Sequence, residues 1–159
     1  MSGFVHSDYP AALEFYEEGL DVLREAGHEE GITHGLANVG TALTGRGAAI
    51  DAAPLIAESL QRYCEKGSLY NIVLSLRRAA AVAAGLDLPE SALRLAGASV
   101  KHESLLGVPE PEVFLQAYAR MLEPARRQLD EESQVRLWAE GSALSIDQAV
   151  GVALQVLSG

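Results

Sequence analysis

Two histidines near the start of the chain are candidates for metal chemistry, because a neutral imidazole is a common metal ligand. His28 and His34 are six residues apart, with two glutamates between them. Histidines that bind zinc from one helix face, as in zinc proteases, are four residues apart. The spacing therefore predicts His28 in a turn and His34 on the following helix, and we expect neither a metal ion nor any other cofactor.

A catalytic nucleophile is not indicated either. Cys64 is the only cysteine, which excludes an intramolecular disulfide and a zinc site built from several cysteines. It lies near the end of an expected helix, where the helix dipole raises a thiol pKa and disfavours the thiolate. His102 and Glu103 are adjacent, and we expect both on a solvated helix face. The sequence thus predicts no enzyme, and a small helical enzyme ranks behind a binding or a structural role.

An adjacent pair of arginines is the best candidate for recognition. Arg77 and Arg78 stand out in a chain with a formal net charge of −10. A guanidinium group presents a planar fork of donors that suits a carboxylate or a phosphate, so the pair could hold a small anionic effector. The alternative is that both arginines pair with acidic neighbours in the fold. The sequence leaves these two roles open.

The composition describes a folded chain of ordinary size. Of 159 residues, 48% are hydrophobic but only 6% are aromatic, which predicts helices packed through small aliphatic side chains. The negative net charge disfavours nucleic acid and anionic membranes as partners, since both require positive charge opposite their phosphates. The sequence has no signal peptide and no apolar run long enough to span a membrane, so we expect a cytoplasmic protein.

The elements that position these residues follow a period of forty. Gly27, Gly67 and Gly107 each end an amphipathic run, where a glycine can adopt the left-handed conformation that terminates a helix. The runs before them align as Ala12, Tyr16, Leu20 and Leu23, then Ala52, Ile56, Leu60 and Tyr63, then Ala92, Ala96 and Val100, with a departure at Glu103. Spacings of four, four and three place each set on one helix face.

These patterns predict an all-α fold of about seven or eight helices. The expected ranges are 9–26, 30–44, 49–66, 69–85, 89–106, 111–128, 131–140 and 146–157. Three helix starts carry a capping signal, which is Ser68 alone, Asp87 with Glu90, and Ser145 with Gln148. We expect a single helical-repeat domain over 1–159, with repeats of about forty residues over 8–107 and C-terminal capping helices over 108–159.

Two stretches resemble the tetratricopeptide repeat. "LANVGTAL", residues 36–43, and "AAIDAAPLIAESL", residues 48–60, match its first and second helices, and Gly47 matches its turn glycine. The period of forty is longer than the usual 34 residues. The resemblance implies a solenoid of helical hairpins with a right-handed superhelix.

The longer period and the C-terminal part are similar to the C-terminal tails of bacterial LuxR-type transcriptional regulators and related signalling ATPases. "ALRLAGASVKHESLLGVPEP", residues 92–111, precedes the Trp-Ala-Glu-Gly run Trp138–Gly141 and the Ser-x-x-x-Ala-Val run Ser145–Val150. Register places Tyr9 just after a repeat's turn, so we expect the first helix of that hairpin in a longer parent protein. The alternative is a complete small protein capped by the helix 9–26. No GxxxxGK[ST] nucleotide loop occurs in the sequence.

The resemblance implies binding without catalysis. The first helix of each hairpin lines the concave surface of such a solenoid. Its ligand-facing positions correspond here to His34, Asn38 and Thr41 in one repeat and to Arg77 and Arg78 in the next. We expect a module that binds a protein, a peptide or a small anionic effector within a signalling or transcriptional regulator. The alternative is a homo-oligomerisation element, in which two copies cover each other's helix 9–26.

Overall fold

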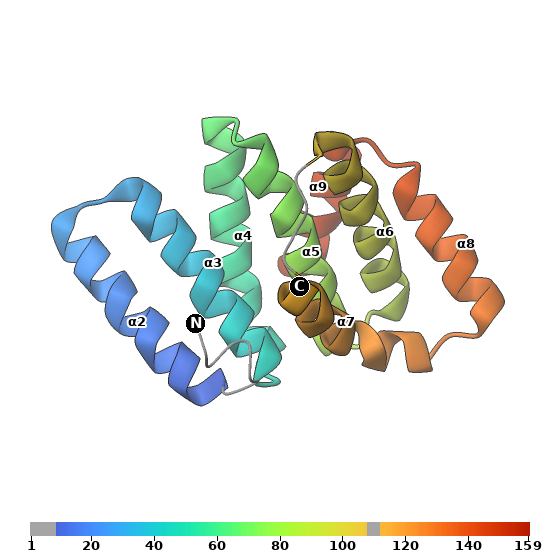
Figure 1. Ribbon diagram of the computed structural model, residues 1–159, viewed down its shortest axis with the longest axis horizontal. Coiled ribbons are helices and arrows are strands. Elements are labelled where there is room, and N and C mark those ends of the chain that lie inside the picture. Colours follow the sequence, from blue (N-terminus) through green and yellow to red (C-terminus); the bar gives the residue numbers. More distant parts are fainter. Residues whose placement is uncertain (1–8, 108–111) are drawn as a thin grey trace.

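The computed structural model describes residues 9–107 and 112–159, and these residues form eight helices and no strand (Figure 1). The helices are α2 (Tyr9–Ala26), α3 (Glu29–Gly45), α4 (Ala49–Lys66), α5 (Leu69–Gly85), α6 (Pro89–Leu106), α7 (Glu112–Arg127), α8 (Glu131–Ser142) and α9 (Ile146–Leu157). The all-α expectation is confirmed, and α2, α4, α5, α6 and α9 have the predicted bounds. None of these helices is long and apolar enough to cross a membrane.

A left-handed residue recurs every twenty positions and ends each of the first five helices. These residues are Gly27, Gly47, Gly67, Asp87 and Gly107, with φ values of 67°, 95°, 66°, 59° and 70°. A positive φ is costly for most side chains, and Asp is one of the few residues other than Gly that tolerates it. Each helix with its turn is therefore a unit of twenty residues, and two such units make up the period of forty.

The capping box predicted at Asp87 and Glu90 is wrong. The N-cap of α6 is Leu88, and its side chain makes no capping hydrogen bond. Asp87 instead occupies the left-handed position that Gly47 occupies forty residues earlier. Its backbone ends α5 and does not start α6.

Consecutive helices from α2 to α6 pack side by side, as their contacts show (Figure 1). Small residues bring them close, because Gly40 of α3 lies against Ile56 of α4 and Gly85 of α5 lies against Ala49. The core forms two clusters of buried aliphatic side chains. One joins α2 and α3, and the larger joins α4, α5 and α6 with residues of α7, α8 and α9.

The last three helices pack mainly against earlier helices and less against one another. α7 lies on α5 and α6, α8 lies along α6, and α9 packs against α4, α5 and α6 (Figure 1). The buried side of α9, formed by Ala149, Ala153, Val156 and Leu157, is therefore covered within the chain. Leu137 of α8 is fully buried, and Trp138 beside it is half-buried.

The α6–α8 contact depends on two glycines. A methyl group on Gly141 of α8 would overlap the carbonyl oxygen of Arg94, and one on Gly97 of α6 would overlap the carbonyl oxygen of Trp138. Both backbones therefore touch where their glycines cross. Gly97 lies in the segment 92–111 and Gly141 in the Trp-Ala-Glu-Gly run, so the two stretches that carry the C-terminal resemblance meet in space.

The capping box at the start of α9 is confirmed, and its loss should be measurable. Ser145 Oγ accepts from the Gln148 amide at 3.1 Å, and Gln148 Oε1 accepts from the Ser145 amide at 2.9 Å. We expect Ser145→Ala to lower the free energy of unfolding by about 1 kcal/mol, measured by urea denaturation. Ser68 is the control, because it is the N-cap residue of α5 but its hydroxyl caps no backbone amide and accepts from the Asn71 side chain instead. Equal losses for Ser145→Ala and Ser68→Ala would contradict this assignment.

Candidate functional site

The five predicted groove residues do not share one cavity. His34 opens on a polar cavity, and Arg77 opens on a separate apolar cavity. Neither cavity is lined by Asn38, Thr41 or Arg78. Asn38 and Arg78 are half-buried, while Thr41 is buried and donates its hydroxyl hydrogen bond to the Ala37 carbonyl at 2.8 Å.

The reason for this separation is the position of α7. The sequence predicts the concave surface along α3 and α5, but α7 packs directly on α5. Burial raises the pKa of Tyr16 on α2 above its usual value, and Tyr118 of α7 adds to this shift. A C-terminal helix thus covers part of the α5 side of this surface.

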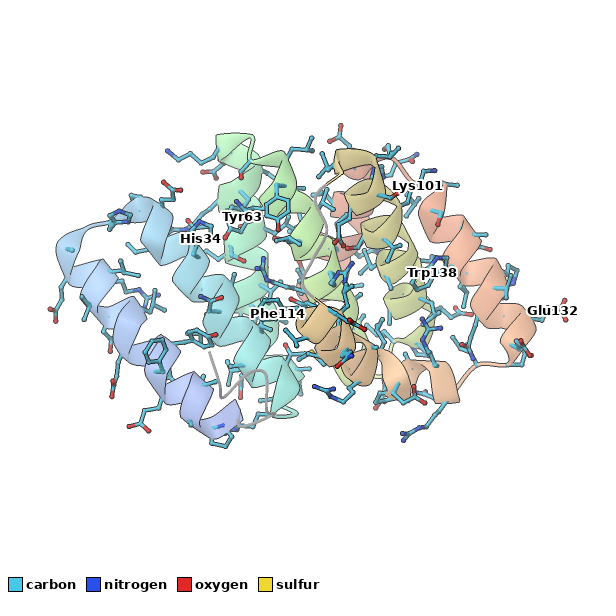
Figure 2. All side chains as sticks on the ribbon, in the orientation of Figure 1. His34, Tyr63, Lys101, Phe114, Glu132 and Trp138 are labelled. Carbon is cyan, nitrogen blue, oxygen red and sulfur yellow. The ribbon has the colours of Figure 1, made fainter. Side chains whose placement is uncertain are left out.

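The polar cavity has a volume of about 660 Å³ and lies between the start of α3, the end of α4 and the start of α5. His34 and Tyr63 lie next to each other there (Figure 2), and His34 Nδ1 and the Tyr63 hydroxyl share a hydrogen bond of 2.6 Å. Burial raises the pKa of Tyr63, Arg78 opposes this shift, and Glu30 adds to it. The hydrogen bond between the two rings therefore joins a neutral phenol to the imidazole.

Several charged side chains of the polar cavity form ion pairs with one another. Arg62 pairs with Glu29 at 3.0 Å and with Glu58 at 2.9 Å, which ties α4 to α3. Asn71 donates to the Ser68 hydroxyl at 2.8 Å. This cavity is thus a junction of three helix ends, in which Arg62, Glu29, Glu58 and Asn71 already have partners.

The structure shows where His28 and Cys64 lie. His28 is the N-cap residue of α3, and its Nδ1 accepts from the Gly31 amide at 2.9 Å, so it lies in a turn as predicted. Cys64 is exposed, and its thiol pKa is raised by partial burial, Asp147 and Glu65. Within residues 9–107 and 112–159, no group of three or more His, Cys, Asp or Glu side chains could hold a metal ion.

The apolar cavity has a volume of about 600 Å³ and lies where α5, α6, α7 and α8 meet. Aliphatic and aromatic side chains make most of its wall. The lining residues are Arg77, Ala96, Val100, Glu103, Ser104, Gly107, Leu115, Tyr118, Ala119, Leu122, Arg126 and Trp138. Clefts that bind small molecules are of this size, and they combine apolar walls with a few placed polar groups.

A buried ion pair forms the polar end of this cavity. Arg77 donates to the Glu103 carboxylate, and each residue is 8% exposed. The Ser99 hydroxyl donates to the same carboxylate at 3.1 Å, and the Tyr118 ring centroid lies 5.5 Å from the Arg77 guanidinium carbon. Arg77 Nε is buried and makes no hydrogen bond to any residue that the structure describes. The sequence left open whether the two arginines bind an anion or pair with acidic neighbours. Arg77 pairs with an acidic neighbour, Glu103.

Glu103 is buried, so the expectation that it lies on a solvated helix face is wrong. His102 is also engaged, because its Nε2 lies 2.9 Å from the Leu144 carbonyl oxygen. One signal for Glu103 was present, since it stands in the apolar stripe at the position of Leu23 and Tyr63. A charged residue in a core stripe indicates a buried partner.

A second arginine opens on the cavity from α7. The Arg126 guanidinium carbon lies 5.4 Å from the Trp138 ring centroid, and Arg126 donates to Gln134 Oε1 at 3.2 Å. Among the described residues Arg126 forms no ion pair. Because Glu103 already pairs with Arg77, the cavity retains one positive charge without a carboxylate partner. The sequence analysis did not select Arg126, Tyr118 or Trp138 for this site.

The cavity lies where the repeat pattern breaks. The stripe residues Leu20 and Leu60 are 6% and 0% exposed, but Val100 at the third equivalent position is 42% exposed and lines the cavity. A smaller side chain and the charged Glu103 replace the larger apolar residues that fill the earlier repeats. The cavity therefore opens beside α6 at the two positions where larger apolar side chains occupy the earlier repeats.

Comparison of the chain with protein-family models, with curated proteins and with solved structures finds no match.

Proposed function

We propose that this chain is a non-catalytic helical-repeat module that binds a small amphipathic anion between α5, α6, α7 and α8. The observation that carries the proposal is the apolar cavity of about 600 Å³ with an arginine that no described carboxylate neutralises. Apolar walls favour a hydrocarbon or aromatic body through burial of its surface. Arg126 favours a carboxylate or sulfonate at one end, because a charged acceptor strengthens a guanidinium hydrogen bond.

We also propose that this module is the C-terminal sensor part of a bacterial signalling or transcriptional regulator. We propose a tetratricopeptide-like arrangement for its helices. The support is the resemblance of residues 92–111, 138–141 and 145–150 to such tails. Two of these segments meet at the α6–α8 crossing, and both helices contribute to the wall of the cavity. A ligand there would contact the helices that the resemblance concerns, so its binding could alter their packing.

The single tryptophan makes the proposal testable. Trp138 lines the cavity, so its fluorescence should change on binding. We expect saturable titrations of the full chain with decanoate and with decanol, and about tenfold tighter binding of decanoate, as one charge-assisted hydrogen bond would provide. The neutral alcohol reports the apolar contribution alone. If neither decanoate nor decanol gives a saturable titration, the cavity is excluded as a site for this ligand class.

A pair of variants separates the role of Arg126 from a general effect of charge. Arg126→Gln is expected to remove the preference for decanoate and to leave decanol binding unchanged. Arg127→Gln makes the same charge change on the neighbouring residue, whose side chain is 73% exposed and pairs with Glu123 outside the cavity. Equal dissociation constants for decanoate in these two variants would contradict recognition of the anion by Arg126.

A further inference from the structure

The outer face of α2 is apolar and has no helix against it among the described residues. Phe15 and Val22 on this face are 63% and 64% exposed, and a side chain added at Gly19 between them would meet nothing within 4 Å. The opposite face of α2 packs on α3 through Leu13 and Leu20, which are buried. We call the surface formed by Phe15, Gly19 and Val22 the α2 outer face.

The period of forty relates this face to equivalent positions on two later helices. The equivalent positions are Leu55, Ser59 and Arg62 on α4 and Leu95, Ser99 and His102 on α6. The preceding helix covers all three positions on α4 and the first two on α6, whereas His102 lies against the Leu144 carbonyl oxygen.

On α4, α3 is the covering helix. Leu55 packs against the α2–α3 core, Ser59 is fully buried, and Arg62 bonds to Glu29 of α3 at 3.0 Å. On α6, α5 is the covering helix. Leu95 and Ser99 are fully buried, and the Ser99 hydroxyl lies 3.4 Å from the Val73 carbonyl oxygen of α5. The α2 outer face therefore has the position and the apolar character of a helix-binding face.

The charge of α2 restricts what can cover this face. The helix carries five acidic residues, Glu14, Glu17, Glu18, Asp21 and Glu25, which are all exposed, and one basic residue, Arg24. Two copies of the chain joined through this face would bring these two acidic sets together, and like charges at an interface are unfavourable. An occupant with lysine or arginine on its flanks would instead be attracted.

We propose that the α2 outer face binds an amphipathic helix of another polypeptide, with small apolar residues along its centre and basic residues on its flanks. This surface is separate from the cavity between α5 and α8, and it would give the module a protein partner in addition to a small effector. Partner helices commonly dock in this way, with an apolar stripe laid against a complementary face.

α5 provides a defined probe, because it covers the equivalent face of α6 and carries Arg77 and Arg78 among alanines. The probe is a labelled peptide of residues 69–85 with neutral ends, and its binding to the full chain is followed by fluorescence anisotropy. We expect saturable one-to-one binding with a dissociation constant below about 1 mM, and Val22→Glu should raise this constant at least tenfold. A peptide with both arginines replaced by glutamate should also bind at least tenfold more weakly.

Controls make each outcome decisive. Val135→Glu adds the same charge at a side chain of α8 that is 66% exposed, and it should leave peptide binding unchanged, as should Arg126→Gln in the cavity. Unchanged melting temperatures would show that the variants are folded. No saturation, or equal binding by Val22→Glu and Val135→Glu, would overturn the proposal. A dimer of the free chain in sedimentation, dissociated by Val22→Glu, would assign the face to a second copy instead.

Discussion

Replacing Glu103 with leucine is expected to destabilise the fold by about 3–5 kcal/mol. The variant would leave the Arg77 guanidinium, which belongs to a residue only 8% exposed, without its carboxylate partner. It would also remove the nearer of the two acceptors of the Ser99 hydroxyl. The penalty arises from an uncompensated buried charge, so it should greatly exceed the net stabilisation that the intact pair provides. The free energy of unfolding, obtained from urea titration of the helical circular dichroism signal, measures it.

Two further variants test whether burial is the cause. The double variant Arg77→Met with Glu103→Leu removes both charges and should be more stable than Glu103→Leu alone, because apolar residues can replace a buried pair at little loss. Glu58→Leu removes a carboxylate from a pair with Arg62 in which the Glu58 side chain is 45% exposed. That loss should stay near 0.5 kcal/mol or below, as roughly expected for an exposed pair four residues apart on a helix. Similar losses for Glu58→Leu and Glu103→Leu would show that the Arg77 site admits water.

The helix bounds could be predicted because their signals are local. An apolar stripe specifies the buried face of each helix. In α2 to α6 a residue with positive φ follows that stripe, so both signals lie within about twenty residues of one another. The differences occur at helix ends, where α8 continues to Ser142 beyond the predicted 140. The Asp87 error had the same local basis. Extending the glycine series to Gly47 would have placed Asp87 forty residues later in a left-handed turn.

The candidate site could not be predicted, because its contacts join distant segments. Arg77 and Arg78 are neighbours of the same type, yet Arg77 lines the cavity and pairs with Glu103, while Arg78 acts on the pKa of Tyr63. Only the packing of α6 and α7 distinguishes them. The predicted groove assumed that the surface along α3 and α5 stays open, and nothing in the pattern of 111–128 indicated that this helix would lie on α5. Glu103 was also expected on a solvated face, although its place in the apolar stripe was a local signal for burial.

Adding one methyl group at Gly141 should destabilise the protein by about 2–3 kcal/mol. In a helix, Gly→Ala ordinarily stabilises by up to about 1 kcal/mol, because alanine restricts the unfolded chain and favours the helix. At Gly141 this gain is outweighed, since the new methyl group would overlap the Arg94 carbonyl oxygen and backbone cannot move aside cheaply. The α6–α8 crossing would have to widen.

Gly151→Ala is the matched control, because Gly151 is an exposed residue within α9 and an added methyl group there meets nothing within 4 Å. The same chemical change should therefore stabilise at one position and destabilise at the other, as thermal and urea unfolding would show. Gly141→Ala should also shift the fluorescence of Trp138, whose backbone lies against Gly97 at the same crossing. A gain in stability for both variants would mean that the two helices are not held in contact by their glycines. A loss confined to Gly141→Ala would give a physical reason why the segment 92–111, with Gly97, and the Trp-Ala-Glu-Gly run occur together in one chain. Each glycine accommodates the backbone of the other helix.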